Sequence, residues 1–69
     1  MEIIIRVAED KYDAAAVAEG MEDAGADVFS IVKAHEVYPK FAVYAKYLPP
    51  ITPEDIDKEI EYVQNKLKG

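Results

Sequence analysis

The sequence contains no cysteine among its 69 residues. Disulfides and thiolate zinc sites are therefore excluded as supports, and a chain of this length builds a core that barely outweighs chain entropy. We expect one small domain over residues 1–69. Regular local structure, close packing or self-association must hold it together.

The first segment, MEIIIRV, is rich in β-branched residues and predicts a strand. Side chains alternate between the two faces of a strand. Ile3, Ile5 and Val7 are the more apolar set and are expected on the core face. The alternate set, expected on the other face, is Glu2, Ile4 and Arg6.

A helix is expected from about Asp10 to Ala24. At about 100° per residue its apolar residues gather on one side, and most are alanines, which lets a helix lie close to a sheet. These residues are Ala14, Val17, Ala18, Met21 and Ala24. Gly25 stands where a left-handed cap would end the helix.

Two further strand-like segments, DVFSIVKAHEV and FAVYAKYL, flank the turn sequence YPKF. Proline suits the second position of a four-residue turn, so we expect a hairpin with a two-residue loop at Pro39 and Lys40. The expected pairs on one face are Tyr38 with Phe41, Glu36 with Val43, Ala34 with Ala45 and Val32 with Tyr47. Those on the other face are His35 with Tyr44 and Lys33 with Lys46. Two facing lysines exclude this second face from the core.

The segment LPPITPED predicts the start of a second helix. Thr52 can cap it, Pro53 fits the first turn, and acidic residues follow at the positive end of the helix dipole. The helix should run to about Leu67. Its apolar stripe is Ile56, Ile60, Val63 and Leu67, with Tyr62 to one side. This spacing also occurs in coiled coils, but two heptads are too few, which favours packing on the sheet.

The expected order is therefore β-α-β-β-α, an α+β fold. A right-handed crossover after the first strand favours a three-stranded antiparallel sheet of order 1-3-2 with both helices on one face. This topology resembles a ferredoxin-like fold that lacks its last strand. The other face of the sheet would be open, and the first strand would be a free edge.

We expect the open face to be apolar and aromatic with a basic fringe. Its expected residues are Ile4, Arg6, Phe29, Ile31, Lys33, His35, Tyr44, Lys46 and Leu48. A patch of this kind on so small a protein usually meets a partner. The alternative is that Phe29 and Ile31 belong to the core, which requires a different placement of the second strand.

Charge is concentrated in residues 9–27, which hold seven acids and one lysine. The helical wheel places Tyr12, Glu19 and Asp23 outward, with Glu22 one turn from Glu19, so that they form an acidic surface. Ala16 and Gly20 are expected beside them, leaving the backbone open to close approach. A basic protein partner would fit this surface. The alternative is a solvated face that keeps the protein soluble.

The only histidine, His35, has no catalytic partner of the usual kinds. Cysteine is absent, Ser30 lies on the opposite strand face, and no second histidine or spaced ligand set completes a metal site. Acid-base chemistry by His35 with Tyr44 is geometrically possible, as in small dimeric isomerases. We expect no catalytic residues, no metal and no cofactor.

Three function classes remain open. The first is a non-enzymatic inhibitor or adaptor that docks its acidic helix onto a basic protein, plausibly one that handles nucleic acid. The second is a homodimer that pairs open sheet faces or edges, with a structural, regulatory or isomerase-like role. The third is single-stranded nucleic-acid binding by Phe29 and Tyr44, which a net charge of −6 opposes.

Location follows from what the sequence lacks. No apolar run reaches the roughly 20 residues of a membrane span, and no basic segment precedes the first strand. We therefore expect a cytoplasmic protein without a membrane partner. The partner-binding residues expected from both surfaces are Tyr12, Glu19, Glu22, Asp23, Phe29, Ile31 and Tyr44.

Overall fold

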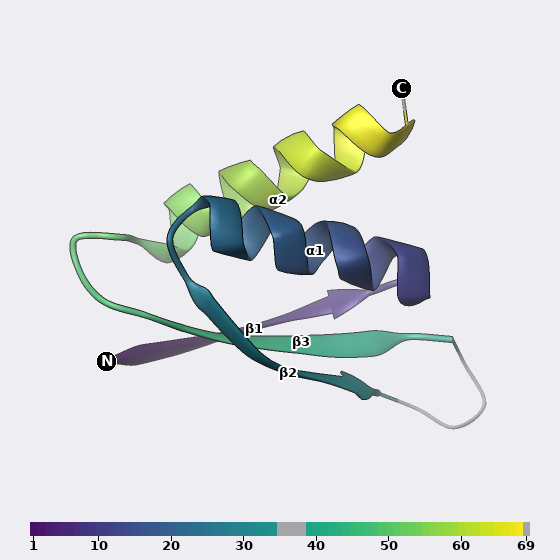
Figure 1. The fold of residues 1–69 in the computed structure, drawn as a ribbon, viewed down its shortest axis with the longest axis horizontal. Coiled ribbons are helices and arrows are strands. Elements are labelled where there is room, and N and C mark those ends of the chain that lie inside the picture. The colour runs from purple at the N-terminus through teal and green to yellow at the C-terminus, as the bar shows by residue number, and fades with distance from the viewer. Residues whose placement is uncertain (35–38, 69) are drawn as a thin grey trace.

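The computed structural model describes residues 1–34 and 39–68. Its elements are β1 (Glu2–Ala8), α1 (Lys11–Asp23), β2 (Asp27–Lys33), β3 (Phe41–Tyr47) and α2 (Pro53–Lys68). The three strands form one antiparallel sheet of order β1-β3-β2. Both helices lie on the same side of this sheet (Figure 1). The α+β fold and the strand order predicted from the sequence are confirmed.

Local signals determine where α1 begins and ends. Asp10 is its N-cap, and its Oδ1 accepts a hydrogen bond from the backbone N–H of Asp13 at 2.8 Å. At the other end Gly25 has a φ of +100°, the left-handed conformation that glycine adopts without strain. Its N–H donates to the carbonyl of Glu22, and that of Ala26 donates to Met21. The predicted glycine cap is confirmed.

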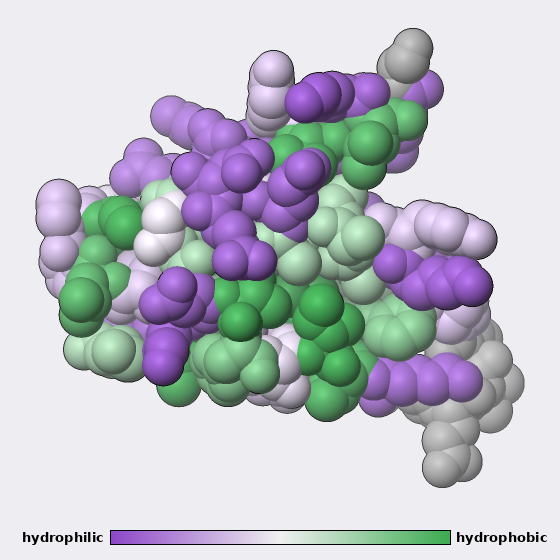
Figure 2. Space-filling model, viewed as in Figure 1, coloured by the Kyte–Doolittle hydropathy of each residue, from purple (hydrophilic) through white to green (hydrophobic). Residues whose placement is uncertain are grey.

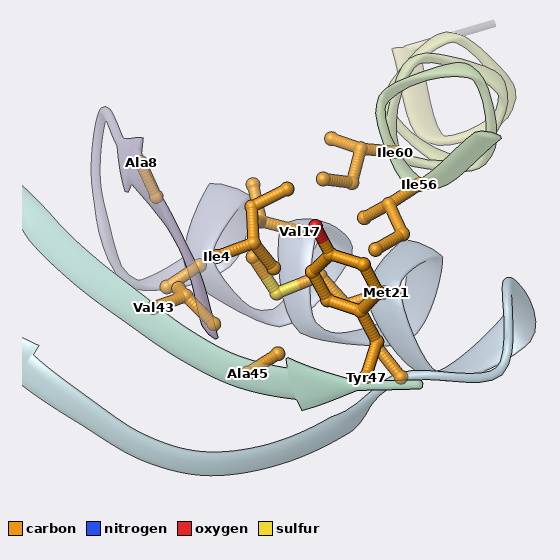
Figure 3. Close-up of a cluster of buried hydrophobic side chains, with 11 residues drawn as sticks. Ile4, Ala8, Val17, Met21, Val43, Ala45, Tyr47, Ile56 and Ile60 are labelled. Carbon is orange, nitrogen blue, oxygen red and sulfur yellow. The ribbon is translucent and has the colours of Figure 1, made fainter. Parts of the chain in front are cut away.

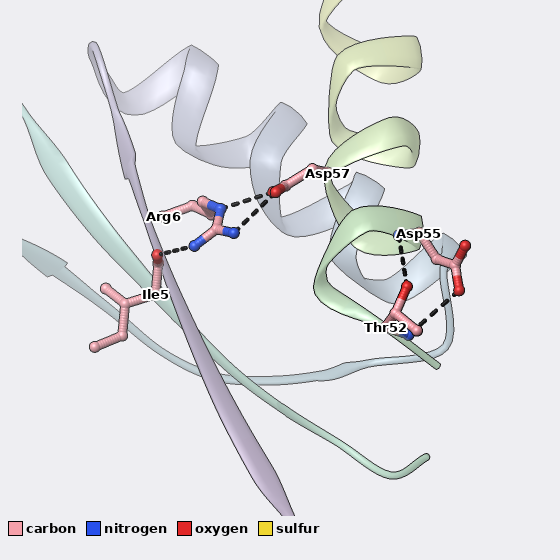
Figure 4. Close-up of polar contacts among 5 residues, drawn as sticks. All are labelled: Ile5, Arg6, Thr52, Asp55 and Asp57. Carbon is pink, nitrogen blue, oxygen red and sulfur yellow. Dashed lines mark hydrogen bonds and ion pairs between the residues drawn. The ribbon is translucent and has the colours of Figure 1, made fainter. Parts of the chain in front are cut away.

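The start of α2 is also the predicted one. The Oγ1 atom of Thr52 accepts from the N–H of Asp55 at 3.2 Å. In return, the Thr52 N–H donates to Oδ2 of Asp55 at 3.3 Å. This reciprocal pair satisfies two backbone groups that the helix leaves without an internal partner (Figure 4).

The core lies between the sheet and α1, and α2 closes it. Its buried members are Ile4, Ala8, Ala14, Val17, Met21, Ala26, Val43, Ala45, Tyr47, Ile56 and Ile60. Figure 3 shows side chains from β1, β3 and both helices converging on this cluster. Several members are alanines, so α1 lies close to the strands and little space remains for large side chains beneath it.

The two helices pack along one another, and Gly20 of α1 is the point of closest approach. A Cβ built on Gly20 would lie 2.5 Å from the Cα of Ile60 in α2. Gly20 and Ala16 are therefore buried, and the prediction that they lie beside the outward acidic surface was wrong. The close approach that a glycine permits here is made by α2.

α2 packs mainly along α1, and through Ile56 and Ile60 its stripe also joins the core cluster of the sheet. Ile56, Ile60 and Val63 are buried as expected. Leu67, the next member of the stripe, is 65% exposed, and Tyr62 is exposed as well. The helices diverge toward the C-terminal end of α2 (Figure 1).

The assignment of faces in β1 was also wrong. Ile4 is 5% exposed and belongs to the core, whereas Ile3, Ile5 and Val7 are exposed. The physical reason is that both helices pack on the face that carries Ile4 and Ala8, which leaves the other set facing outward.

The hairpin register differs from the predicted one. Lys33 pairs with Phe41 and Ile31 with Val43, and the N–H of Ala34 donates to the carbonyl of Lys40. The prediction of a two-residue loop at Pro39 and Lys40 was therefore wrong. The predicted partners His35, Glu36 and Tyr38 lie outside the described residues.

The sheet partner of Tyr44 in β2 is Ser30, which replaces the predicted His35. The register shifts between Val28 and Ser30, as at a β-bulge with Phe29 as the extra residue. Beyond this bulge Ile31 pairs with Val43, a core residue, so it belongs to the helix-side face. Its predicted place on the open face was wrong.

Candidate protein interface

The open face of the sheet carries a continuous set of large apolar side chains. Cross-strand partners project from the same side, so the register defines this face. Its exposed apolar members are Ile3, Ile5, Val7, Phe29 and Val32, which are 61, 47, 62, 51 and 44% exposed. We call these five residues, with Tyr44, the open face. Figure 2, with the helices above the sheet, shows hydrophobic residues along the strands and hydrophilic residues over much of α2.

A row of three side chains crosses the middle of the open face. Ile5 of β1 pairs with Tyr44 of β3, and the bulge in β2 places Phe29 beside the same tyrosine. The ring centroids of Phe29 and Tyr44 are 6.1 Å apart, with an angle of 56° between the planes. A tilted aromatic pair of this kind is favourable. An aromatic pair therefore lies at the centre of the face.

Charged residues lie at one end of this face. Asp27 of β2 and Lys46 of β3 are cross-strand partners there, and Ile3 flanks Lys46 from β1. Opposite charges at such positions attract one another modestly. The open face thus has an apolar centre with a polar margin, the arrangement found in protein interfaces.

An ion pair lies beside the edge strand β1. Arg6 donates from Nε to Oδ1 of Asp57 at 2.7 Å and from Nη2 to Oδ2 at 2.9 Å, which holds the start of α2 over β1 (Figure 4). Its Nη1 also donates to the carbonyl of Ile5. The hydrogen bonds between Arg6 and Asp57 lower the pKa of Asp57 and raise the pKa of Arg6.

The same ion pair affects which surface a partner can use. The guanidinium lies between β1 and α2 and already binds a backbone carbonyl of β1 (Figure 4). A strand added to β1 would meet this side chain at the middle of the edge. Arg6 thereby gives the edge some of the protection that inward charges provide in other sheets. The open face, without such an obstacle, is the better candidate interface.

The residues expected to bind partners divide between separate surfaces. Phe29 and Tyr44 meet on the open face, while Ile31 is 47% exposed on the helix-side face. The other four, all on α1, are exposed: Tyr12, Glu19, Glu22 and Asp23. Sequence reasoning missed Ile3, Ile5, Val7 and Val32. The signal for the three in β1 was that apolar residues also stand on its other face, at Ile4 and Ala8, which a strand with one solvated face does not require. Nothing in the sequence distinguished Val32.

The chemistry available here is that of contact and burial. Within residues 1–34 and 39–68 no group of three or more His, Cys, Asp or Glu side chains is placed to hold a metal ion. No helix in that part of the chain is long and apolar enough to cross a membrane. Comparison with protein-family models, with characterised proteins and with solved structures found no match.

Proposed function

We propose that this protein is a non-enzymatic interaction module that self-associates through the open face, so that the sheets of two copies stack. The supporting observation is the row of Ile5, Tyr44 and Phe29 among further exposed apolar side chains. A twofold axis would place the open face of one copy against the open face of the other. Aligned sheets stack at about 10 Å with their side chains interleaved.

The area of the face sets the strength of this association. Seven residues at about 3.3 Å each and three strands about 4.8 Å apart give roughly 330 Å² per copy. Covering both faces would yield at most about 16 kcal/mol at roughly 25 cal/mol per Å², because Asp27, Ser30 and Lys46 occupy part of the area, against an association cost of roughly 4–15 kcal/mol. A standard interface covers about 800 Å² per partner. We therefore expect a weak dimer that forms at micromolar concentration.

Two isoleucines make a matched test of this proposal. Ile5 and Ile31 are both 47% exposed, but Ile5 lies on the open face and Ile31 on the helix-side face. Ile5→Lys should give a folded monomer, because a lysine at the centre of the interface would be buried without a partner. Ile31→Lys should leave the dimer largely intact. Sedimentation velocity gives the mass, and circular dichroism checks the fold.

Three outcomes are informative. Loss of the dimer in Ile5→Lys alone supports the proposal. Equal loss in both variants would move the interface to the β2 edge, and retention of the dimer by Ile5→Lys would exclude the open face.

A second candidate function is an inhibitor or adaptor that docks α1 onto a basic protein. It is supported by the exposure of Tyr12, Glu19, Glu22 and Asp23. Electrostatic attraction would accelerate encounter and make affinity fall as salt is added. A double variant, Glu19→Lys with Asp23→Lys, should lose any partner found by pull-down while keeping its fold. Binding that ignores both the charge reversal and the salt would reject this function.

A further inference from the structure

The second surface of interest is a cleft where the two helices diverge. The side chains of Gln64 in α2 and Asp13 in α1 still meet there, since Nε2 donates to Oδ1 at 2.8 Å. Beyond this contact lies a cleft of about 470 Å³ between the first turns of α1 and the last turns of α2. Figure 2 shows it as a notch below the C-terminal end of the chain.

Large apolar side chains surround this cleft. Val7 from β1, Tyr12 from α1 and Leu67 from α2 line it and are 62, 74 and 65% exposed. Leu67 continues the α2 stripe that is buried as far as Val63. The apolar face of α2 thus extends past its intramolecular partner and borders the cleft.

The charge around the cleft is mainly negative. Glu9, Asp10 and Asp13 line it, against one lysine, Lys68. Asp10 and Asp13 already accept backbone hydrogen bonds at the start of α1. Within the described residues, the Glu9 carboxylate accepts none. The C-terminal end of the α2 dipole also favours a cation.

Tyr12 supplies a further observation. The Nζ atom of Lys11 lies over its ring, 5.2 Å from the centroid. An exposed aromatic face beside carboxylates therefore already holds an ammonium group in this structure. Such a ring attracts cations from other molecules in the same way.

We propose that this cleft binds a basic amphipathic helix of a partner protein. The apolar side of the helix packs between Tyr12 and Leu67, and its lysines or arginines meet Glu9 and Asp10. The lining is too exposed to enclose a small molecule, whereas a helix brings anchors at i, i+3 and i+4 that cover an open groove. This site shares only Val7 with the open face, and it does not depend on self-association.

The test uses a synthetic 14-residue helical peptide of leucine and lysine, with a control peptide in which glutamate replaces lysine. Binding is measured by calorimetry at low and high salt, and backbone amide shifts locate the contact. Each measurement is made with the wild-type chain and with Ile5→Lys, which alters the open face only. We expect the basic peptide to bind both forms, the acidic peptide to bind neither, and shifts to map to Tyr12 and Leu67.

A matched pair of variants on α2 completes the test. Leu67 and Tyr62 are 65 and 63% exposed, but only Leu67 lines the cleft. Leu67→Ser should weaken peptide binding about tenfold, and Tyr62→Ser should change it less than about twofold. Equal effects of the two substitutions, or shifts confined to the open face, would overturn the proposal. Loss of self-association in Ile5→Lys with peptide binding retained separates the two proposals.

Discussion

The two faces of the sheet differ in how far their apolar side chains are covered by other parts of the chain. The face beneath α1 is buried and carries Ile4 and Tyr47 together with the smaller Ala8, Val43 and Ala45. The opposite face carries Ile3 and Ile5 in contact with solvent. A chain that had only to fold would place its largest apolar side chains inside. The exposure of Ile3 and Ile5 supports our proposal that a second copy covers this face.

The alanines of α1 explain how the chain can pack its core while isoleucines of the sheet stay exposed. The small side chains let the helix approach the strands, and Gly20 lets α2 approach α1 in turn. Close packing of small groups replaces the volume of a larger core. The helix side therefore supplies folding stability, whereas the open face supplies association in our proposal.

Truncation of a buried and of an exposed isoleucine should give the largest difference in the free energy of unfolding. Ile56 is 0% and Ile3 61% exposed. Ile56→Ala should lower the free energy of unfolding by about 3 kcal/mol through lost burial and a cavity, and Ile3→Ala by less than about 0.5 kcal/mol in dilute solution. Chemical denaturation measures both.

Two controls sharpen this prediction. If Ile56→Ala fails to fold, Ile56→Val should still cost about 1 kcal/mol. The effect of Ile3→Ala should grow with protein concentration, because it weakens a dimer that stabilises the folded chain. Similar costs for Ile56→Ala and Ile3→Ala in dilute solution would contradict the division between the two faces.

Gly20→Ala should have the next largest effect on the free energy of unfolding. It should destabilise the protein although alanine has the higher helix propensity. Alanine favours helix by about 1 kcal/mol over glycine, yet its Cβ would lie 2.5 Å from the Cα of Ile60. Backbone atoms there must separate, so we expect a net loss of about 2 kcal/mol. Ala15→Gly, at an exposed position of the same helix, is the control and should cost about 1 kcal/mol. Thermal unfolding at low concentration distinguishes them, and a more stable Gly20→Ala would refute the contact.

Removal of the α2 cap should have a smaller effect. Thr52→Ala deletes the Oγ1 acceptor for the Asp55 N–H and should cost about 1 kcal/mol. Thr52→Ser keeps the acceptor and should cost little. Urea denaturation of both variants tests the cap, and equal losses would show that the hydroxyl is not what matters.

The ion pair of Arg6 with Asp57 should contribute least. Both side chains are more than a third exposed, so solvent screening limits the pair to about 0.5 kcal/mol. Since its partner lowers the pKa of Asp57 in the folded state, the stabilisation is present above the unfolded pKa, near 4, and is lost as pH falls through the folded pKa. Asp57→Asn should therefore be less stable at pH 7 and comparable at pH 2. An unchanged difference between pH 7 and pH 2 would contradict this role.

Local features could be predicted from the sequence because neighbouring residues determine them. Thr52 and Asp55 cap α2 whatever lies beyond it, and Gly25 ends α1 because its backbone can adopt a positive φ. The alternation of apolar segments then gave the order of elements and, with the crossover rule, the strand order.

The faces and contacts could not be predicted because distant segments determine them. Ile3 and Ile4 are equally apolar, and the side of the sheet on which the helices pack decides which of them is buried. The role of Gly20 depends on where α2 crosses α1. The β2 register depends on a bulge at Phe29. The open face was therefore expected from the topology, but several of its residues were assigned incorrectly.

The most direct test of the account is the mass of the wild-type protein in solution as a function of concentration. Sedimentation equilibrium from low to high micromolar concentration should show the mass rise from 7.7 kDa, the value for one chain, toward twice that value. The midpoint should lie in the micromolar range. A mass of one chain throughout this range would show that a second copy does not cover the open face, and the central proposal would be wrong.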